Sequence, residues 1–98
     1  MIHNLETILI IFKQPRWPHE FIISKFSQNY KVEYFFISNL IEKNNKEIIK
    51  LINTTIKNKK ISIALFEGDH ISIINFDFIN SIKVKKKGLF LFDDFMYH

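Results

Sequence analysis

The chain has 98 residues, a net charge of +4 and no cysteine, and these values exclude several classes of protein. At this length we expect one domain, spanning residues 1–98, of only marginal stability. Without cysteine there is no disulfide framework, no thiol nucleophile and no Cys-based zinc site. The longest early apolar run, Ile8 to Phe12, is too short to cross a bilayer, and no signal-peptide pattern accompanies it. We therefore expect a cytoplasmic protein without a membrane span.

The positive charge is concentrated in lysine runs at 57–60 and 83–87. One interpretation is an anionic partner. The other, which we favour, is a set of solvated faces and turns, because Lys, Asn, Ile and Phe share A/T-rich codons. No aromatic residue interleaves with these lysines, so the pattern predicts no nucleic-acid partner.

The first expected elements are a strand and a helix. Thr7 to Phe12 is a continuous apolar, β-branched run, typical of a strand buried on both faces. Pro15 breaks it, and Pro18 suits the first turn of a helix. The spacing predicts a helix from Pro18 to Tyr30, with its apolar face formed by Phe21, Ile22, Phe26 and Tyr30.

A strand over Lys31 to Ser38 and a helix over Asn45 to Lys59 follow. In the helix, Ile48, Ile49, Ile52, Thr55 and Ile56 recur with helical period. Either Asn44 or Asn45 can cap its start, and the lysines at its end complement the helix dipole.

The third expected strand, Ile61 to Phe66, is ended by residues 67–70. Residues 71–82 fit either a helix or an alternating strand, and we favour a short helix because strands and helices alternate elsewhere. Gly88 then opens a fourth strand, Leu89 to Phe92.

This alternation predicts an α/β fold, a Rossmann-like or flavodoxin-like three-layer sandwich with a four-stranded parallel sheet. The chain ends soon after its fourth strand, where such domains normally continue. We therefore expect a truncated domain, the amino-terminal part of a longer two-domain protein. Truncation would expose an apolar face and promote self-association; its residues are Phe90, Phe92, Phe95 and Met96.

Ligands of open parallel sheets bind beyond the carboxyl ends of the strands, where strand order reverses. Polar side chains follow three of the expected strands: Lys13, Gln14, Arg16, Trp17 and His19; Glu67, Asp69 and His70; and Asp93, Asp94, Tyr97 and His98. The alternative interpretation is that these are ordinary loop residues, because polar residues are common in any loop. In a 3-2-1-4 strand order the first and fourth loops flank the reversal, whereas in a 2-1-3-4 order Asp69 and His70 take that place.

Several specific motifs are absent. No Gly-x-Gly-x-x-Gly or Walker-type loop follows the first strand, which argues against a Rossmann dinucleotide site or a P-loop. Lys13-Gln14 stands where a receiver domain has an acidic pair. Asp93-Asp94 with His98 indicates a metal site only weakly, because such an acidic pair more often caps a helix or accepts hydrogen bonds from the backbone amides of a loop. We expect neither a metal nor a cofactor.

Two stretches carry a family resemblance: Ile63-Ala64-Leu65-Phe66-Glu67-Gly68-Asp69-His70, and Gly88-Leu89-Phe90-Leu91-Phe92-Asp93-Asp94. They resemble the amino-terminal domain of GT-B glycosyltransferases, most closely the group related to the spore-maturation protein CgeB. The order of strands and helices resembles that of the family over nearly the whole chain, but only about fifteen residues match the motifs of the family. It implies the acceptor-side half of an enzyme that moves a sugar from a nucleotide sugar to an acceptor, without an obligatory metal. Such enzymes hold the nucleotide mainly in a second domain, so both substrates would be partners only of a complete enzyme.

A transferase needs a base within hydrogen-bond reach of the acceptor hydroxyl. The candidate catalytic residues are His19, Asp69 and Asp93. Lys13 and Arg16 could offset phosphate charge, and Trp17, His70 and Asp94 are further candidates for substrate binding. Two alternatives stay open: a stand-alone flavodoxin-like binding or regulatory module without catalysis, and a truncated half of another α/β enzyme.

Overall fold

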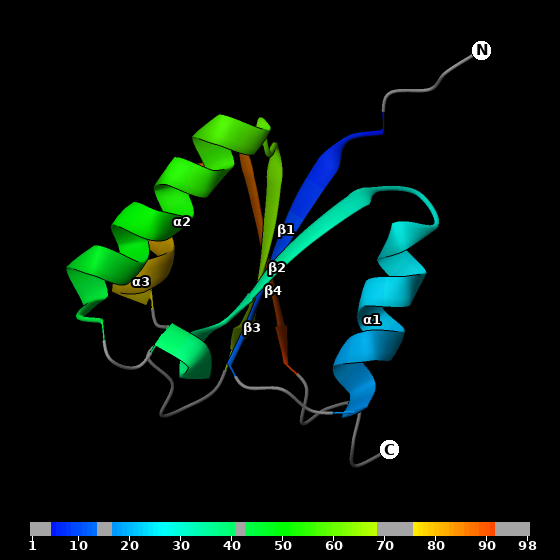
Figure 1. Ribbon diagram of the computed structural model, residues 1–98, viewed down its shortest axis with the longest axis horizontal. Helices are drawn as coiled ribbons and strands as arrows, with labels where there is room; N and C mark the ends of the chain where they lie inside the picture. The colour runs from blue at the N-terminus through cyan, green and yellow to red at the C-terminus, as the bar shows by residue number, and fades with distance from the viewer. Residues whose placement is uncertain (1–4, 14–16, 41–42, 69–75, 92–98) are drawn as a thin grey trace.

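The computed structural model describes residues 5–13, 17–40, 43–68 and 76–91, and they form an α/β fold (Figure 1). Its strands are β1 Thr7–Phe12, β2 Lys31–Phe36, β3 Ile63–Gly68 and β4 Lys86–Leu91. Its helices are α1 Trp17–Ser27, α2 Asn45–Lys59 and α3 Phe76–Ser81, with the 3₁₀ helix η1 Ile37–Leu40 after β2. The four strands make one parallel sheet between helices, so the expected fold class is confirmed.

The sheet is ordered β2-β1-β3-β4, which makes β1 an interior strand paired on both sides. Every residue from Ile8 to Phe12 is buried. A strand covered on both faces loses water from successive side chains, and this explains the unbroken apolar run. The expected burial of this strand on both faces is confirmed.

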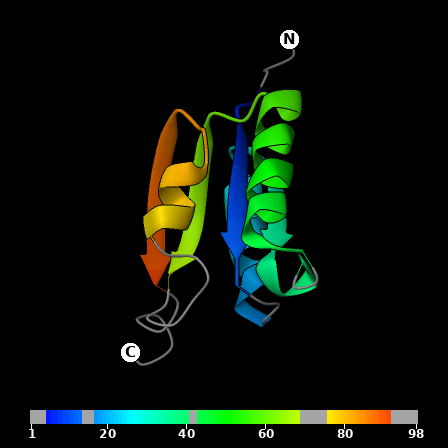
Figure 2. The ribbon, with the colours of Figure 1, turned by 90° about the vertical axis from the view of Figure 1, so that its left-hand side faces the viewer.

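Helices lie on both faces of the sheet, with α1 opposite α2 and α3 (Figure 1), and Figure 2 looks onto the face that α2 and α3 cover. On one face, Leu9 and Ile11 of β1 belong to the larger core, with buried residues of α2 and α3. On the other face, Ile10 and Phe12 contact apolar residues of α1 and β2. The alternation of β1 side chains thus divides the interior into two cores. Among the described residues, no helix has the length and apolar character needed to cross a membrane.

The buried face of α1 differs from the expected one. Phe21 is 61% exposed, with the Lys25 ammonium 5.8 Å from the centre of its ring. The buried or half-buried positions on the helix are His19, Ile22, Ile23 and Phe26. They follow the i, i+3, i+4, i+7 pattern of one helical face, with His19 as its first member. Tyr30 lies beyond the end of the helix at Ser27.

Helix α2 has the expected bounds, Asn45–Lys59. The two alternatives for its cap are now resolved, because Asn44 Oδ1 accepts the Glu47 N–H at 2.8 Å. At the other end Lys60 adopts the left-handed conformation, with φ of 54°, and its N–H returns to carbonyls of the last turn. Ile48, Ile52 and Ile56 face the core.

Three strand bounds were predicted wrongly. β2 ends at Phe36 rather than Ser38, because η1 begins at Ile37. β3 spans Ile63–Gly68 rather than Ile61 to Phe66, which puts Glu67 inside the strand and not in a loop. β4 begins at Lys86, so Gly88 lies within the strand rather than opening it.

The ambiguous stretch 71–82 contains the favoured helix, observed as α3 over Phe76–Ser81, while 71–75 lie outside the described residues. The apolar face that truncation was expected to expose also lies largely outside the described residues. Phe92, Phe95 and Met96 are not described, nor is the side chain of Phe90.

Gly88 is paired in register with Leu65 of β3. A Cβ atom placed on Gly88 would lie 2.6 Å from Leu65 Cδ2. Leu65 is also half-buried against the core beneath α1. The space that a side chain at position 88 would need is therefore filled by Leu65.

We predict that Gly88→Ala lowers the free energy of unfolding by about 1 kcal/mol, because Leu65 must shift to admit the methyl group. In a Leu65→Ala background the same change should be neutral or stabilising by about 0.5 kcal/mol, since Ala then retains only its advantage over Gly in a strand. Urea unfolding of the four proteins in this double-mutant cycle measures the coupling. Equal effects of Gly88→Ala in both backgrounds would contradict the assignment.

Candidate functional site

The strand order identifies the switch point, which is the place where successive strands begin to be added on the other side of β1. The chain passes from β1 to β2 on one side and from β3 to β4 on the other. The carboxyl ends of β1 and β3 therefore flank the switch point, where ligands of open α/β sheets bind. β4 lies at the sheet edge, separated from β1 by β3. Of the two strand orders considered from the sequence, 2-1-3-4 is the observed one.

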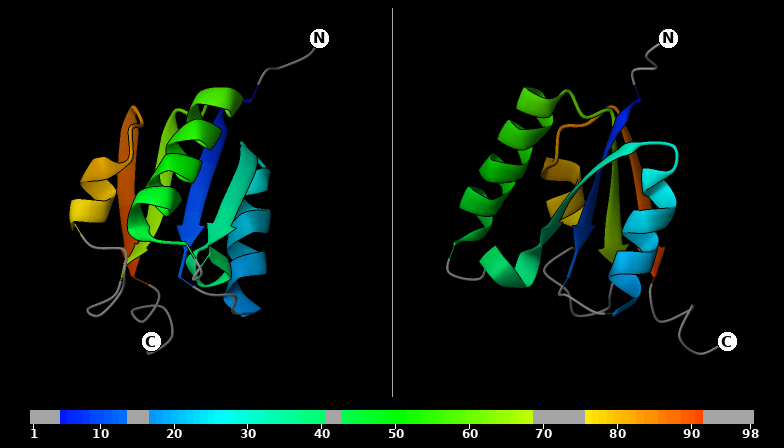
Figure 3. Two further views of the ribbon diagram at one scale, coloured as in Figure 1. Left: turned by 60° about the vertical axis from the view of Figure 1, so that its left-hand side comes forward. Right: turned by 45° about the vertical axis from the view of Figure 1, so that its right-hand side comes forward.

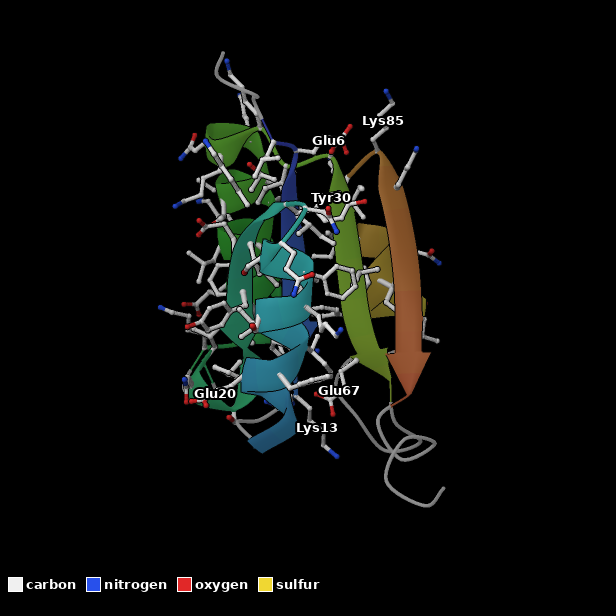
Figure 4. The ribbon with its side chains drawn as sticks, turned by 90° about the vertical axis from the view of Figure 1, so that its right-hand side faces the viewer. Glu6, Lys13, Glu20, Tyr30, Glu67 and Lys85 are labelled. Carbon is white, nitrogen blue, oxygen red and sulfur yellow. The ribbon has the colours of Figure 1, made fainter. Side chains whose placement is uncertain are left out.

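Glu67, near the end of β3, has its carboxylate at the switch point. Its Oε1 accepts the backbone N–H of Lys13, the first residue after β1, at 2.8 Å. Side chains alternate along a strand, so Glu67 shares the α1 side of the sheet with Leu65. Figure 4 shows Glu67 and Lys13 together at the carboxyl end of the strands, beside the start of α1, with Glu6 and Lys85 at the opposite end. One carboxylate thus links the ends of two neighbouring strands.

His19 approaches the same carboxylate from α1. Its Nε2 lies 3.5 Å from Glu67 Oε1. Its ring packs against Phe12, with centroids 4.0 Å apart, and against Phe36 at 5.4 Å. The imidazole is therefore held by aromatic rings from the ends of β1 and β2 while its nitrogen faces β3.

The burial of this pair is its most unusual property. His19 is 1% exposed and Glu67 is 3% exposed, and they are the two buried polar or charged residues of the described part of the chain. A buried carboxylate is costly unless hydrogen bonds replace its lost water. The Lys13 N–H supplies one such bond. The two residues together form a polar centre inside an otherwise apolar core.

Lys13 is fixed through its backbone on both sides. Its N–H donates to Glu67, and its carbonyl accepts the N–H of Ser38 in η1 at 2.9 Å. The start of the loop after β1 is thereby tied to β3 and to η1, which follows β2. The arrangement suits the positioning of a ligand-binding loop.

Of the residues proposed from the sequence, the structure brings His19 and Lys13 together. Trp17 begins α1, although its side chain is not described. Five others lie outside the described residues: Arg16, Asp69, His70, Asp93 and Asp94. The roles proposed for all of them stay predictions.

Sequence reasoning named Glu67 among the polar residues after the third strand but gave it no role in the site, because it was assigned to the following loop. Its position two residues beyond Leu65 was the available signal, since that spacing puts both side chains on one face of a strand. As for metals, the described residues contain no group of three or more His, Cys, Asp or Glu side chains arranged to hold an ion.

Comparisons with protein-family models, with curated proteins and with solved structures find no match to this chain. The function must therefore be argued from the site itself.

We predict that Glu67→Ala lowers the free energy of unfolding by about 1–3 kcal/mol, because it leaves the Lys13 N–H without its acceptor and His19 without the carboxylate beside it. Glu67→Gln should cost less, since its amide oxygen can still accept from Lys13. Glu20→Ala, at an exposed carboxylate on α1, is the matched control and should change stability by less than about 0.5 kcal/mol. Urea denaturation of the three variants is the measurement. A Glu67→Ala protein as stable as the control would show that the carboxylate is not structural.

Proposed function

We propose that the chain is the acceptor-side, amino-terminal part of a glycosyltransferase, and that it transfers no sugar by itself. The observation that carries the proposal is the buried Glu67 carboxylate at the switch point of a parallel sheet. This carboxylate accepts a hydrogen bond from the backbone N–H of Lys13, the first residue of the loop after β1. A polar centre that is costly to bury and lies where such folds bind ligands is best explained by a binding role.

Within this proposal the buried pair has a positioning role. A general base must come within hydrogen-bond distance of the hydroxyl that it deprotonates. His19 and Glu67 are both buried, and the His19 Nε2 faces Glu67 rather than solvent. We therefore propose that they fix the loop after β1, although His19 was first considered as the base.

The observed strand order makes Asp69 the preferred base candidate. It follows Glu67 by two residues, after the strand that borders the switch point. Asp93 follows β4 at the sheet edge, which makes it the weaker candidate. His70 is proposed to contact the acceptor, and Lys13 and Arg16 to offset phosphate charge.

A stand-alone flavodoxin-like binding or regulatory module is the second candidate. The strand order favours it, because 2-1-3-4 is the flavodoxin-like order and not the 3-2-1-4 order of the dinucleotide-binding halves. Both candidates place the ligand at the same switch point. They differ in whether the ligand is a sugar acceptor. For either one we propose a cytoplasmic location, which the absence of cysteine fits.

We predict that the chain binds saccharides and not nucleotides. In NMR titrations of the ¹⁵N-labelled chain, a panel of mono- and disaccharides should shift the amide signals of Lys13 and Glu67, while UDP and GDP leave them unchanged. Asp69→Ala should weaken saccharide binding by about tenfold or more, the loss expected when a ligand hydroxyl loses a charged partner.

Asp77→Ala is the control, because Asp77 is an exposed carboxylate on α3 and its loss should leave the affinity unchanged. Nucleotide binding at Lys13 and Glu67 without saccharide binding would contradict the acceptor-side proposal and support the second candidate.

A further inference from the structure

A second feature lies away from the switch point, on the face covered by α2 and α3. An open groove of about 910 Å³ follows α2 where the end of α3 meets it. Figure 3 shows the two helices side by side on this face. The groove is lined by Lys46, Ile49, Lys50, Asn53, Thr54, Ile56, Lys57, Ser81 and Lys83.

Hydrogen bonds from one side chain hold the two sides of the groove together. Asn53 Nδ2 donates to the Ser81 carbonyl at 3.0 Å, and Asn53 Oδ1 accepts the Lys83 N–H at 2.7 Å. Both ends of the amide are therefore used to fix the end of α3 against the middle of α2. The groove is a built feature of the fold rather than a gap between independent elements.

All the charged side chains that line the groove are positive. Of its lining residues, four are lysines and none is acidic. Lys46, Lys50 and Lys57 follow one stripe of α2, with Asn53 between them, at helical spacing. Two lysines outside the groove have polar partners: Lys59 Nζ lies 3.1 Å from Glu33, and Lys87 Nζ donates to the Ile79 carbonyl. Within the described residues, no ion pair involves the four groove lysines.

Helix stability accounts for Lys57, which lies in the last turn of α2, but not for Lys46 and Lys50. Lys46 lies in the first turn of α2, near the positive end of the helix dipole, where a cation is unfavourable. Lys46 and Lys50 are also like charges at i, i+4, which repel across one turn. An anion in the groove would relieve both costs.

The shape and chemistry of the groove identify its occupant. Ile49 lines it as a half-buried side chain alongside the lysines, and Ile56 lies beneath it in the core. The groove therefore has a small apolar centre and a polar rim, as protein interfaces have. A concave surface is poorly suited to a flat membrane. The lining has no aromatic residue and no arginine, so it offers neither base stacking nor bidentate phosphate contacts. We propose that this groove binds an acidic peptide segment of a partner protein, with its carboxylates on the lysines and an apolar side chain on Ile49.

Fluorescence anisotropy tests this with a short fluorescein-labelled peptide rich in Glu and Leu. A peptide in which every Glu is replaced by Gln serves as the probe without charge. We expect the acidic peptide to bind and the neutral one to bind far more weakly. The variant K46Q/K50Q/K57Q should weaken binding of the acidic peptide by about tenfold at low ionic strength, as expected for three charge pairs of modest strength.

The matched control is K25Q/K31Q/K85Q, which removes the same charge from exposed lysines outside the groove. It should weaken binding by less than about twofold if the groove, and not net charge, binds the peptide. Equal losses in the two variants would overturn the proposal. So would the absence of peptide binding, or tighter binding to a thymidine oligonucleotide or to phosphatidylglycerol vesicles than to the peptide.

Discussion

A carboxylate buried at the end of β3 is the constraint on which the arrangement of the switch point depends. Glu67 is 3% exposed, so its carboxylate loses its hydration and receives the Lys13 N–H in return, with His19 beside it. Because the three residues come from β3, from the end of β1 and from α1, their contact joins elements that are distant in the sequence. A substitution at Glu67 or His19 should therefore disturb the geometry of the loops that carry the candidate ligand contacts, whereas Lys13 takes part through its backbone.

Much of the fold follows from local patterns in the sequence. The unbroken apolar run of β1 predicts an interior strand, and the period of α2 predicts both of its ends. Strand order could not be predicted, because right-handed crossovers allow either 3-2-1-4 or 2-1-3-4. The burial of Glu67 was missed for a related reason. A lone acidic residue after an apolar run is ordinarily solvated, and only its contacts with α1 and β1 make it part of the interior.

The two faces of the sheet carry different proposed activities. The switch point offers a small polar centre at the strand ends, suited to ordering a loop around a ligand. The α2–α3 groove offers cations spread along a helix that Asn53 joins to the end of α3, suited to an extended anionic segment. These proposals rest on separate residues, so each can fail without affecting the other. If both proposals are correct, the same sheet supports a ligand site at the switch point and a peptide-docking site in the α2–α3 groove.

The most direct test of the account is amide hydrogen exchange at Lys13, because the bond to Glu67 is what ties the loop to β3. The Lys13 N–H should exchange about a hundredfold or more slowly than an exposed amide, and it should lose this protection in Glu67→Ala while the amides inside β1 keep theirs. Exchange of the Lys13 N–H at the rate of an exposed amide in the unmodified protein would contradict the account, because the buried carboxylate would then not hold the loop.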